Sequence, residues 1–232
     1  MTFARRPVAL ALAGVAGLIA IHQFLGAPSE AAAPLAGRAV AVDGDTLDVQ
    51  GQRVRLEGID APERGQTCGR RLVGQWKCGR AAQEALDELV AGRRVDCEQK
   101  GQDKYGRSLG ICFVDGRDIN AELVRRGLAW AFVQYSQTYV TQEAEARKEK
   151  AGIWQGAAET PWSFRAQKWQ TAENAAPKGC AIKGNVTGNG RIYHVPWGDW
   201  YHKVKVEPEK GERWFCDEAE AVAAGWRPAI AR

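Results

Sequence analysis

Residues Val42–Glu63 carry the sequence V-D-G-D-T-L-D-V-Q-G-Q-R-V-R-L-E-G-I-D-A-P-E, which decides the fold of this chain. Two short alternating segments, T-L-D-V-Q and R-V-R-L-E, flank a Gly-Gln pair. This alternation predicts two strands, and the glycine between them predicts the turn of a β-hairpin. Because a hairpin brings its two ends together, we expect Asp45 and Asp60 to share one site.

The acids at the ends of the hairpin indicate a cation. Carboxylates held close together repel each other unless a positive charge lies between them. Asp45 and Asp60 offer oxygen ligands, and the three histidines lie elsewhere, at His22, His194 and His202. Oxygen ligands favour calcium or magnesium over zinc or copper. The alternative for D-G-D-T is an ordinary turn with solvated acids.

Three further charged residues would complete a site for phosphoryl transfer. Glu63 lies three residues after Asp60 on a proline turn, where it could act as base on a water near the cation. Arg55 lies on the second strand, and Arg107 lies in the sequence D-K-Y-G-R. Two guanidinium groups beside a cation and a base are suited to stabilising phosphate oxygens. The alternative is that both arginines pair with the acids and only hold the fold.

The composition is that of a folded protein, since 45% of the 232 residues are hydrophobic and 26% are charged. The formal charge of +4 does not by itself indicate a nucleic-acid partner. About five strands in hairpins precede the tail, with helices over 80–91, from 119 to a stop at Gly127, and over 141–153. A small antiparallel barrel with attached helices, an OB-like architecture of the α+β class and mainly β, is the simplest closure.

Residues 1–34 differ from the rest of the chain. Two arginines, Arg5 and Arg6, precede an apolar run over residues 8–21 and then a series of small residues. This order is typical of a cleaved export signal, and the alternative is an uncleaved membrane anchor through residues 7–25. Either interpretation places the remainder outside the cytoplasm, in the periplasm or secreted.

Export changes the interpretation of the six cysteines, because an oxidising compartment favours disulfides. Proximity in the sequence suggests the pairs Cys68–Cys78, Cys97–Cys112 and Cys180–Cys216. Sequence alone does not select one pairing among the many that six cysteines allow. The second pair would cross a hairpin of strands 94–98 and 108–114, joined by a loop over 99–106.

The C-terminal part has a composition of its own. Residues 157–179 are rich in Ala, Gln, Thr and Pro and predict a partly helical linker. Residues 180–232 predict a small α+β domain of unknown role, with short strands and a helix near 217–224. A domain of roughly fifty residues needs a staple, which Cys180–Cys216 would supply. A zinc site of these cysteines with His194 and His202 is the alternative, although its spacing matches no zinc-finger pattern.

Four motifs occur in order within residues 37–156: A-V-D-G-D-T-L, V-R-L-E-G-I-D-A-P-E, D-K-Y-G-R-S-L-G and I-N-A-E-L-V-R-R-G-L-A-W. Together they resemble the staphylococcal nuclease (thermonuclease) family. The resemblance implies a five-stranded OB-fold β-barrel with three helices over residues 35–156. It also implies a calcium-dependent phosphodiesterase that acts on DNA and RNA and leaves 3′-phosphate ends.

The resemblance also implies roles for individual residues. Asp45 and Asp60 would hold Ca²⁺, with Asp43 just outside the ligand set. The backbone carbonyl of Ala61 would be a further ligand; the family's founding member has threonine here, and alanine retains that carbonyl. The general base would be Glu63.

Phosphate and substrate contacts follow from the same resemblance. Arg55 and Arg107 would stabilise the phosphate, and the remaining substrate contacts would be made by Lys104, Tyr105 and Tyr135. Val133 replaces one of two tyrosines that border the nucleotide pocket in the family, which changes the expected base stacking. The Cys68–Cys78 loop is an addition near the pocket.

The alternative function is a non-catalytic OB-fold protein that binds nucleic acid or the cell envelope. Loss of Asp60, Glu63 or Arg107 would favour that alternative, and all three residues are present. No obligate protein partner is evident in the sequence, and we expect a monomer.

Overall fold

The computed structural model describes residues 35–229, and the predicted hairpin lies at its centre. β2 (Thr46–Val49) and β3 (Gln52–Leu56) pair in antiparallel orientation. Gln50 and Gly51 form the turn between them, both with positive φ, at 51° and 87°. Two successive left-handed residues give the tight turn whose twist matches that of the strands. The hairpin predicted from the sequence is confirmed.

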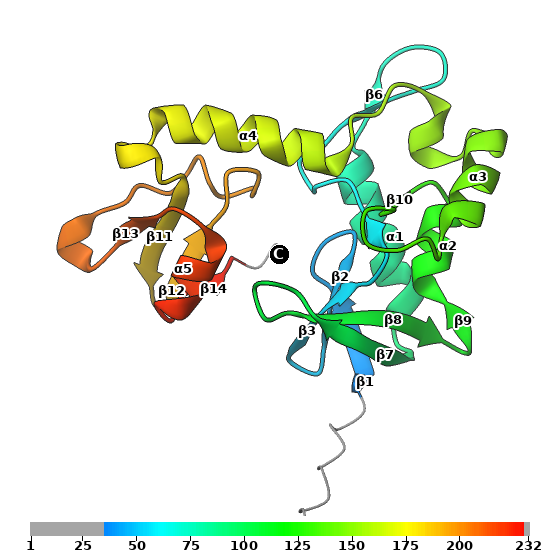
Figure 1. Cartoon of the computed structure of the whole chain (residues 1–232), viewed down its shortest axis with the longest axis horizontal. Helices are drawn as coiled ribbons and strands as arrows, with labels where there is room; N and C mark the ends of the chain where they lie inside the picture. The colour runs from blue at the N-terminus through cyan, green and yellow to red at the C-terminus, as the bar shows by residue number, and fades with distance from the viewer. Residues whose placement is uncertain (1–34, 230–232) are drawn as a thin grey trace, which may run out of the picture. The chain divides into compact units, whose positions relative to one another are not determined.

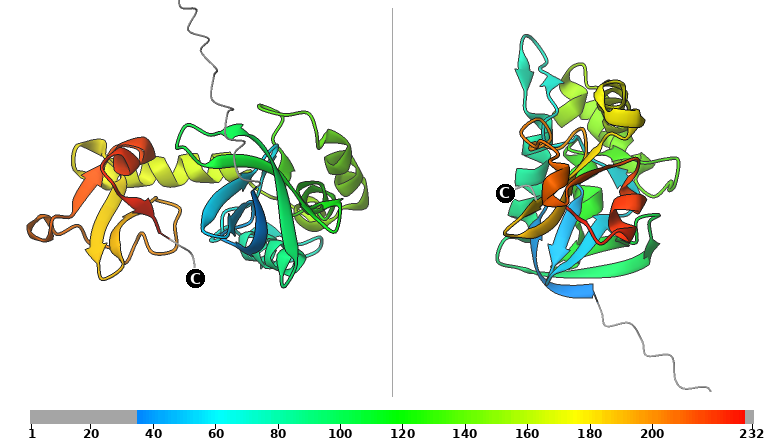
Figure 2. Two further views of the ribbon diagram at one scale, coloured as in Figure 1. Left: turned by 90° about the horizontal axis from the view of Figure 1, so that it is seen from below. Right: turned by 90° about the vertical axis from the view of Figure 1, so that its left-hand side faces the viewer.

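Three further strands complete the barrel: β1 (Leu35–Ala41), β7 (Arg94–Gln102) and β8 (Ser108–Val114). The strand order is β3-β2-β1-β7-β8, and β3 also pairs with β8, which closes the sheet on itself (Figure 2). The β3–β8 pairing is parallel, so the barrel is mixed rather than antiparallel as expected. The predicted five-stranded OB-like barrel with helices is confirmed.

β7 is longer than the sequence suggested. A loop was expected over 99–106, but the strand continues to Gln102. Its pairing with β8 shifts register between Gln99 and Gly101, and Gly101 has a φ of 132°. An irregularity of this kind bends a strand without ending its pairing. Pairing with a long neighbouring strand therefore outweighs the polar, glycine-containing sequence, and only residues 103–107 remain as the turn.

Three helices accompany the barrel: α1 (Cys78–Val90) and α2 (Ile119–Arg125) pack on its strands, and α3 (Val140–Glu149) packs on α2 (Figure 1). Each lies where the sequence predicts a helix. Apolar side chains of α1 and α2 join those of the barrel strands in one core. The remaining elements of this part are short: β4 (Ile59–Asp60), β5 (Cys68–Gly69), β6 (Gln75–Trp76), β9 (Arg117–Asp118), β10 (Trp130–Ala131) and a 3₁₀ turn at Gly152–Gln155.

The buried side chain of Asn120 joins α2 to the barrel. Its Oδ1 accepts a hydrogen bond from the backbone N–H of Cys112 at 3.2 Å. Its Nδ2 donates to the carbonyl oxygens of Glu57 at 2.9 Å and Gly110 at 3.2 Å. A buried amide with its partners supplied is stabilising and specific. The bonds fix the end of β3, from which the chain continues to Asp60.

The segment after the barrel contains α4 (Pro161–Ala175), so the expected linker is largely a helix. Thr160 caps it, because its Oγ1 accepts from the N–H of Ser163, and Pro161 occupies the first turn.

A four-stranded sheet of order β13-β11-β12-β14 follows α4 in the chain (Figure 1). Its elements are β11 (Ile182–Thr187), β12 (Gly190–His194), β13 (Arg213–Phe215), α5 (Glu218–Ala223) and β14 (Arg227–Pro228), with 3₁₀ turns at Pro177–Gly179 and Pro208–Lys210.

All six cysteines are joined as the sequence suggested, in the pairs Cys68–Cys78, Cys97–Cys112 and Cys180–Cys216. Cys97 and Cys112 are directly opposite each other on β7 and β8. The third disulfide consumes both thiols that a zinc site would need, and Nε2 of His194 is hydrogen-bonded to Oδ1 of Asn185 at 2.9 Å. The structure therefore favours the Cys180–Cys216 disulfide over a zinc site.

The predicted export signal or anchor, residues 1–34, lies outside the described residues. Between residues 35 and 229, no helix has the length and apolar character needed to cross a bilayer.

A close contact at the start of α1 generates a first prediction. A Cβ atom on Gly79 would overlap the backbone carbonyl of Glu63 and lie 2.9 Å from Cα of Arg64. Because backbone atoms cannot rotate away, we expect Gly79→Ala to lower the free energy of unfolding by about 2–4 kcal/mol. Urea and thermal unfolding would measure the loss. Gly65→Ala is the matched control, since a Cβ there meets nothing within 4 Å. Equal stability of the two variants would contradict the prediction.

Candidate active site

The site is built around Arg55, a residue of β3 whose guanidinium joins two carboxylates. Its Nη1 donates to Oδ1 of Asp45 at 2.6 Å, and its Nη2 donates to Oδ1 of Asp60 at 2.8 Å. The exposed fractions of the two aspartate side chains are 6% and 0%. Thr46 lies opposite Arg55 in the hairpin, so the register of β2 and β3 places Asp45 beside this arginine. The two acids therefore share one site, as the sequence suggested.

Backbone hydrogen bonds fix the orientation of Asp45. Its second oxygen, Oδ2, accepts from the N–H of Ala61 at 2.7 Å. The N–H of Asp45 in turn donates to Oδ1 of Asp43 at 3.1 Å. The D-G-D turn and the segment after β4 thus hold each other in place. Ala61 and Asp43, both expected near the metal ligands, lie beside Asp45.

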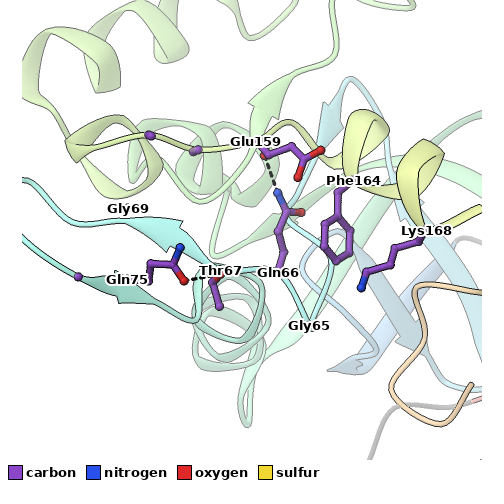
Figure 3. A pocket seen from close by; sticks show the side chains of 11 residues that line it. Gly65, Gln66, Thr67, Gly69, Gln75, Glu159, Phe164 and Lys168 are labelled. Atoms are coloured by element: carbon purple, nitrogen blue, oxygen red, sulfur yellow. Dashed lines mark hydrogen bonds between the residues drawn. The ribbon is translucent and has the colours of Figure 1, made fainter. Parts of the chain in front are cut away.

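Glu63 is positioned by a residue that the sequence did not single out, Gln66. The N–H of Glu63 donates to Oε1 of Gln66 at 3.1 Å, and Nε2 of Gln66 donates to the carbonyl of Glu159 at 2.5 Å. Gln66 is buried, and a cavity of about 740 Å³ lies beside it, lined also by Phe164 and Lys168 of α4 (Figure 3). Gln66 thereby links the expected base to the segment that leads into α4.

A second arginine, Arg165, reaches the same acids from α4. Its Nη2 donates to Oδ2 of Asp60 at 2.7 Å, and its Nη1 lies 3.1 Å from Oδ1 of the same residue. Nη1 also donates to Oε1 of Glu63 at 2.8 Å. This contact could not be predicted from the sequence, because 105 residues separate Arg165 from Asp60 and the segment resembles no nuclease motif.

More negative than positive charge collects at this point. We call the four carboxylates the acid cluster: Asp43, Asp45, Asp60 and Glu63. Burial raises the pKa of Asp45, although Arg55 opposes the shift. Burial likewise raises the pKa of Glu63 to about 8, against the effect of Arg165. For Arg55, burial opposes the charge, but Asp45 and Asp60 outweigh it and raise the pKa. Two guanidinium groups thus face four acids, and burial favours the protonated forms of Asp45 and Glu63.

The donor chemistry of the acid cluster fits a hard divalent cation. Carboxylate oxygens are the ligands that calcium prefers. Within residues 35–229, no three His, Cys, Asp or Glu side chains converge as an open group of metal ligands. In the acid cluster, the guanidinium groups of Arg55 and Arg165 hold the oxygens of Asp60.

The turn between β7 and β8 carries the expected phosphate contacts. Oδ1 of Asp103 accepts from the N–H groups of Tyr105 and Arg107, both at 2.9 Å, and its Oδ2 accepts from Nε of Arg107 at 2.6 Å. Nζ of Lys104 lies 4.9 Å from the centroid of the Tyr105 ring. Of the ion pairs described, Arg107 forms one with Asp103 and none with the acid cluster. The structure therefore brings Arg55 onto the acids but not Arg107, whose role stays a prediction.

The expected stacking residue, Tyr135, is open to solvent. Its side chain is 72% exposed, and its ring centroid lies 4.9 Å from that of Phe132. Val133, which replaces the second tyrosine, is 55% exposed. One aromatic face is therefore available in this region where the family resemblance implies two.

Comparison with known proteins identifies the family of the barrel. Residues 53–156 match the family described as staphylococcal nuclease homologue. The chain is 38% identical over 145 residues to an uncharacterized endonuclease of Escherichia coli O157:H7, covering 59% of this chain and 88% of that protein. It is 36% identical over 142 residues to a micrococcal nuclease of Shigella flexneri, covering 53% and 76%.

A further relative is not named as a nuclease. The succinoglycan biosynthesis protein ExoI of Rhizobium meliloti (strain 1021) is 39% identical over 127 residues, which cover 53% of this chain and 66% of that protein, just under two thirds of its length. The barrel and its helices, the family match over residues 53–156 and the extensive alignment with the endonuclease lead to one conclusion. The chain belongs to the staphylococcal nuclease family, with an additional C-terminal region.

Proposed function

We propose that this chain is an exported, calcium-dependent nuclease that hydrolyses phosphodiester bonds in DNA and RNA and leaves 3′-phosphate ends. The observation that carries the proposal is the arrangement of Asp45, Asp60 and Glu63 around two partly buried arginines at a staphylococcal nuclease barrel. Relatives named as nucleases and endonucleases support it. Three disulfides, typical of proteins outside the cytoplasm, support export.

Asp45 and Asp60 would hold the calcium ion, with the Ala61 carbonyl as a further ligand and Asp43 adjusting the local charge. These side chains are held in place before any ligand arrives, by Arg55 and by the N–H of Ala61. When bound, calcium supplies Lewis-acid stabilisation of negative charge on the phosphate oxygens. Arg55 adds hydrogen-bond donors to the same charge.

Glu63 is the group that takes up the proton in the proposed reaction. A water attacks phosphorus from the side opposite the 5′ oxygen and gives its proton to the Glu63 carboxylate. The new P–O bond forms while the bond to the 5′ oxygen breaks, and that oxygen takes a proton from solvent. The products are a 3′-phosphate and a 5′-hydroxyl. Gln66 fixes the backbone of Glu63 and so maintains the direction of its carboxylate.

Substrate binding is assigned to the turn between β7 and β8 and to Tyr135. Lys104, Tyr105 and Arg107 lie on a turn that Asp103 holds in shape, and such a group suits neighbouring phosphates of a polyanion. The exposed ring of Tyr135 offers a stacking surface for a base. The fork of Arg107 would stabilise the transition-state phosphate once substrate is bound.

The first test of this function is cation-dependent cleavage with a variant of the base. We expect the full-length protein to degrade DNA and RNA with Ca²⁺, to stop with a chelator, and to leave 3′-phosphates in end-group analysis. Glu63→Gln should reduce the rate by about 100-fold or more, because the amide cannot accept the proton of the water. Glu84→Gln, a change on the exposed side of α1, is the control. Wild-type rates in Glu63→Gln, or nucleic-acid binding without cleavage, would contradict the proposal.

A second test concerns the geometry of Arg107. Arg107→Lys keeps the positive charge but removes the two-pronged donor, so we expect the rate constant for cleavage to fall by about 100-fold with little change in melting temperature. Single-turnover cleavage of a short labelled DNA would measure it. Arg38→Lys, on an exposed position of β1, should cleave at the native rate. A native rate in Arg107→Lys would rule out a transition-state role.

A further inference from the structure

The contact between Arg165 and the acid cluster has a consequence for the metal. Arg165 lies in α4, beyond the residues that match the nuclease family, and donates to both Asp60 and Glu63. Its side chain is 23% exposed, against 0% for Asp60, so the contact is largely shielded from water. The Coulomb attraction between charges shielded in this way is stronger than that between charges on the surface. The contact is therefore part of the site.

Apolar packing holds α4 at this place independently of the ion pairs. The ring of Trp162 stacks on Phe132 with centroids 5.7 Å apart, and meets Trp130 edge-on at 6.3 Å. Trp130 is the residue of β10 that lies opposite Asp60 in β4. Arg165 follows Trp162 by three residues on the same helix, so its Cα stays near the acids whatever its guanidinium contacts.

The oxygens that Arg165 binds are the ones the proposed reaction needs. Arg55 and Arg165 together engage both oxygens of Asp60, and Arg165 holds Oε1 of Glu63. A carboxylate binds a cation through these lone pairs, and a base takes a proton through them. A guanidinium and a divalent cation also repel each other. Arg165 in this position and a cation bound to Asp60 therefore oppose each other.

We propose that Arg165 is a built-in counter-cation that competes with calcium for Asp60 and also holds Glu63, so that calcium binding requires its guanidinium to swing away. The proposal rests on the proposed function in taking Asp60 as a metal ligand and Glu63 as the base. The helix remains docked through Trp162, and the long arginine side chain alone moves. The residue thereby sets the calcium concentration at which the site is assembled and Glu63 becomes free to act as base.

Direct measurement of calcium binding tests this proposal without relying on cleavage. Full-length wild type, Arg165→Gln and Lys168→Gln, freed of divalent ions, would be titrated with CaCl₂ in a calorimeter. We expect Arg165→Gln to bind Ca²⁺ about tenfold or more tightly, because a competing positive charge is gone. Lys168→Gln removes a charge from the same helix, but that residue forms none of the ion pairs described for the acid cluster. Its affinity should stay within about twofold of wild type.

Two further variants show whether calcium binds at Asp60 and provide a test in case Arg165→Gln does not fold. Asp60→Asn should abolish the binding heat. If Arg165→Gln does not fold, Arg165→Lys carries the test, because one ammonium replaces a fork that spans two acids, and its calcium affinity should lie above that of wild type. Unchanged or weaker binding on removal of the guanidinium, or no calcium binding by any protein, would overturn the proposal. Calcium binding of the expected order without hydrolysis would instead overturn only the nuclease function.

Discussion

The burial of Asp45 and Asp60 on either side of Arg55 is the constraint on which the site depends. An isolated carboxylate in a protein interior costs several kcal/mol, and removing one member of a buried ion pair leaves that cost uncompensated. The register of the β2–β3 hairpin supplies the arginine at the required position. Asn120 donates to the carbonyl of Glu57, the residue after β3, and so fixes the start of the segment that leads to Asp60. The barrel thus holds the carboxylates of Asp45 and Asp60 close together.

Arg165 extends the working unit beyond the barrel. The family match ends at residue 156, whereas the partners of Asp60 and Glu63 include a side chain of α4. Gln66 joins the backbone of Glu63, the expected base, to the carbonyl of Glu159, which lies just before this helix. The added helix therefore contributes a direct contact to the acid cluster.

The sequence allowed prediction of the features that are local or belong to known motifs. The hairpin, the sharing of one site by Asp45 and Asp60, and the helices follow from alternation, turn residues and helical spacing. The continuation of β7 to Gln102 could not be predicted, since pairing with β8 decides it. The contact of Arg165 could not be predicted either, because a single arginine in a helix does not indicate a partner 105 residues earlier. Arg107 illustrates the opposite case: a motif predicts its role, but its described ion pair is with Asp103 and not with the acid cluster.

The exposed and buried charges of this site differ in their response to ionic strength. Lys104 is exposed and the side chain of Arg107 is 34% exposed, whereas Asp60 has no exposed surface. At physiological salt the screening length is about 8 Å, which weakens interactions through solvent far more than those between buried groups. Added salt will therefore reduce the attraction of a polyanion to the β7–β8 turn while leaving the pairing inside the acid cluster nearly unchanged. In the proposed nuclease, ionic strength would therefore affect the capture of nucleic acid separately from the pairing of the carboxylates.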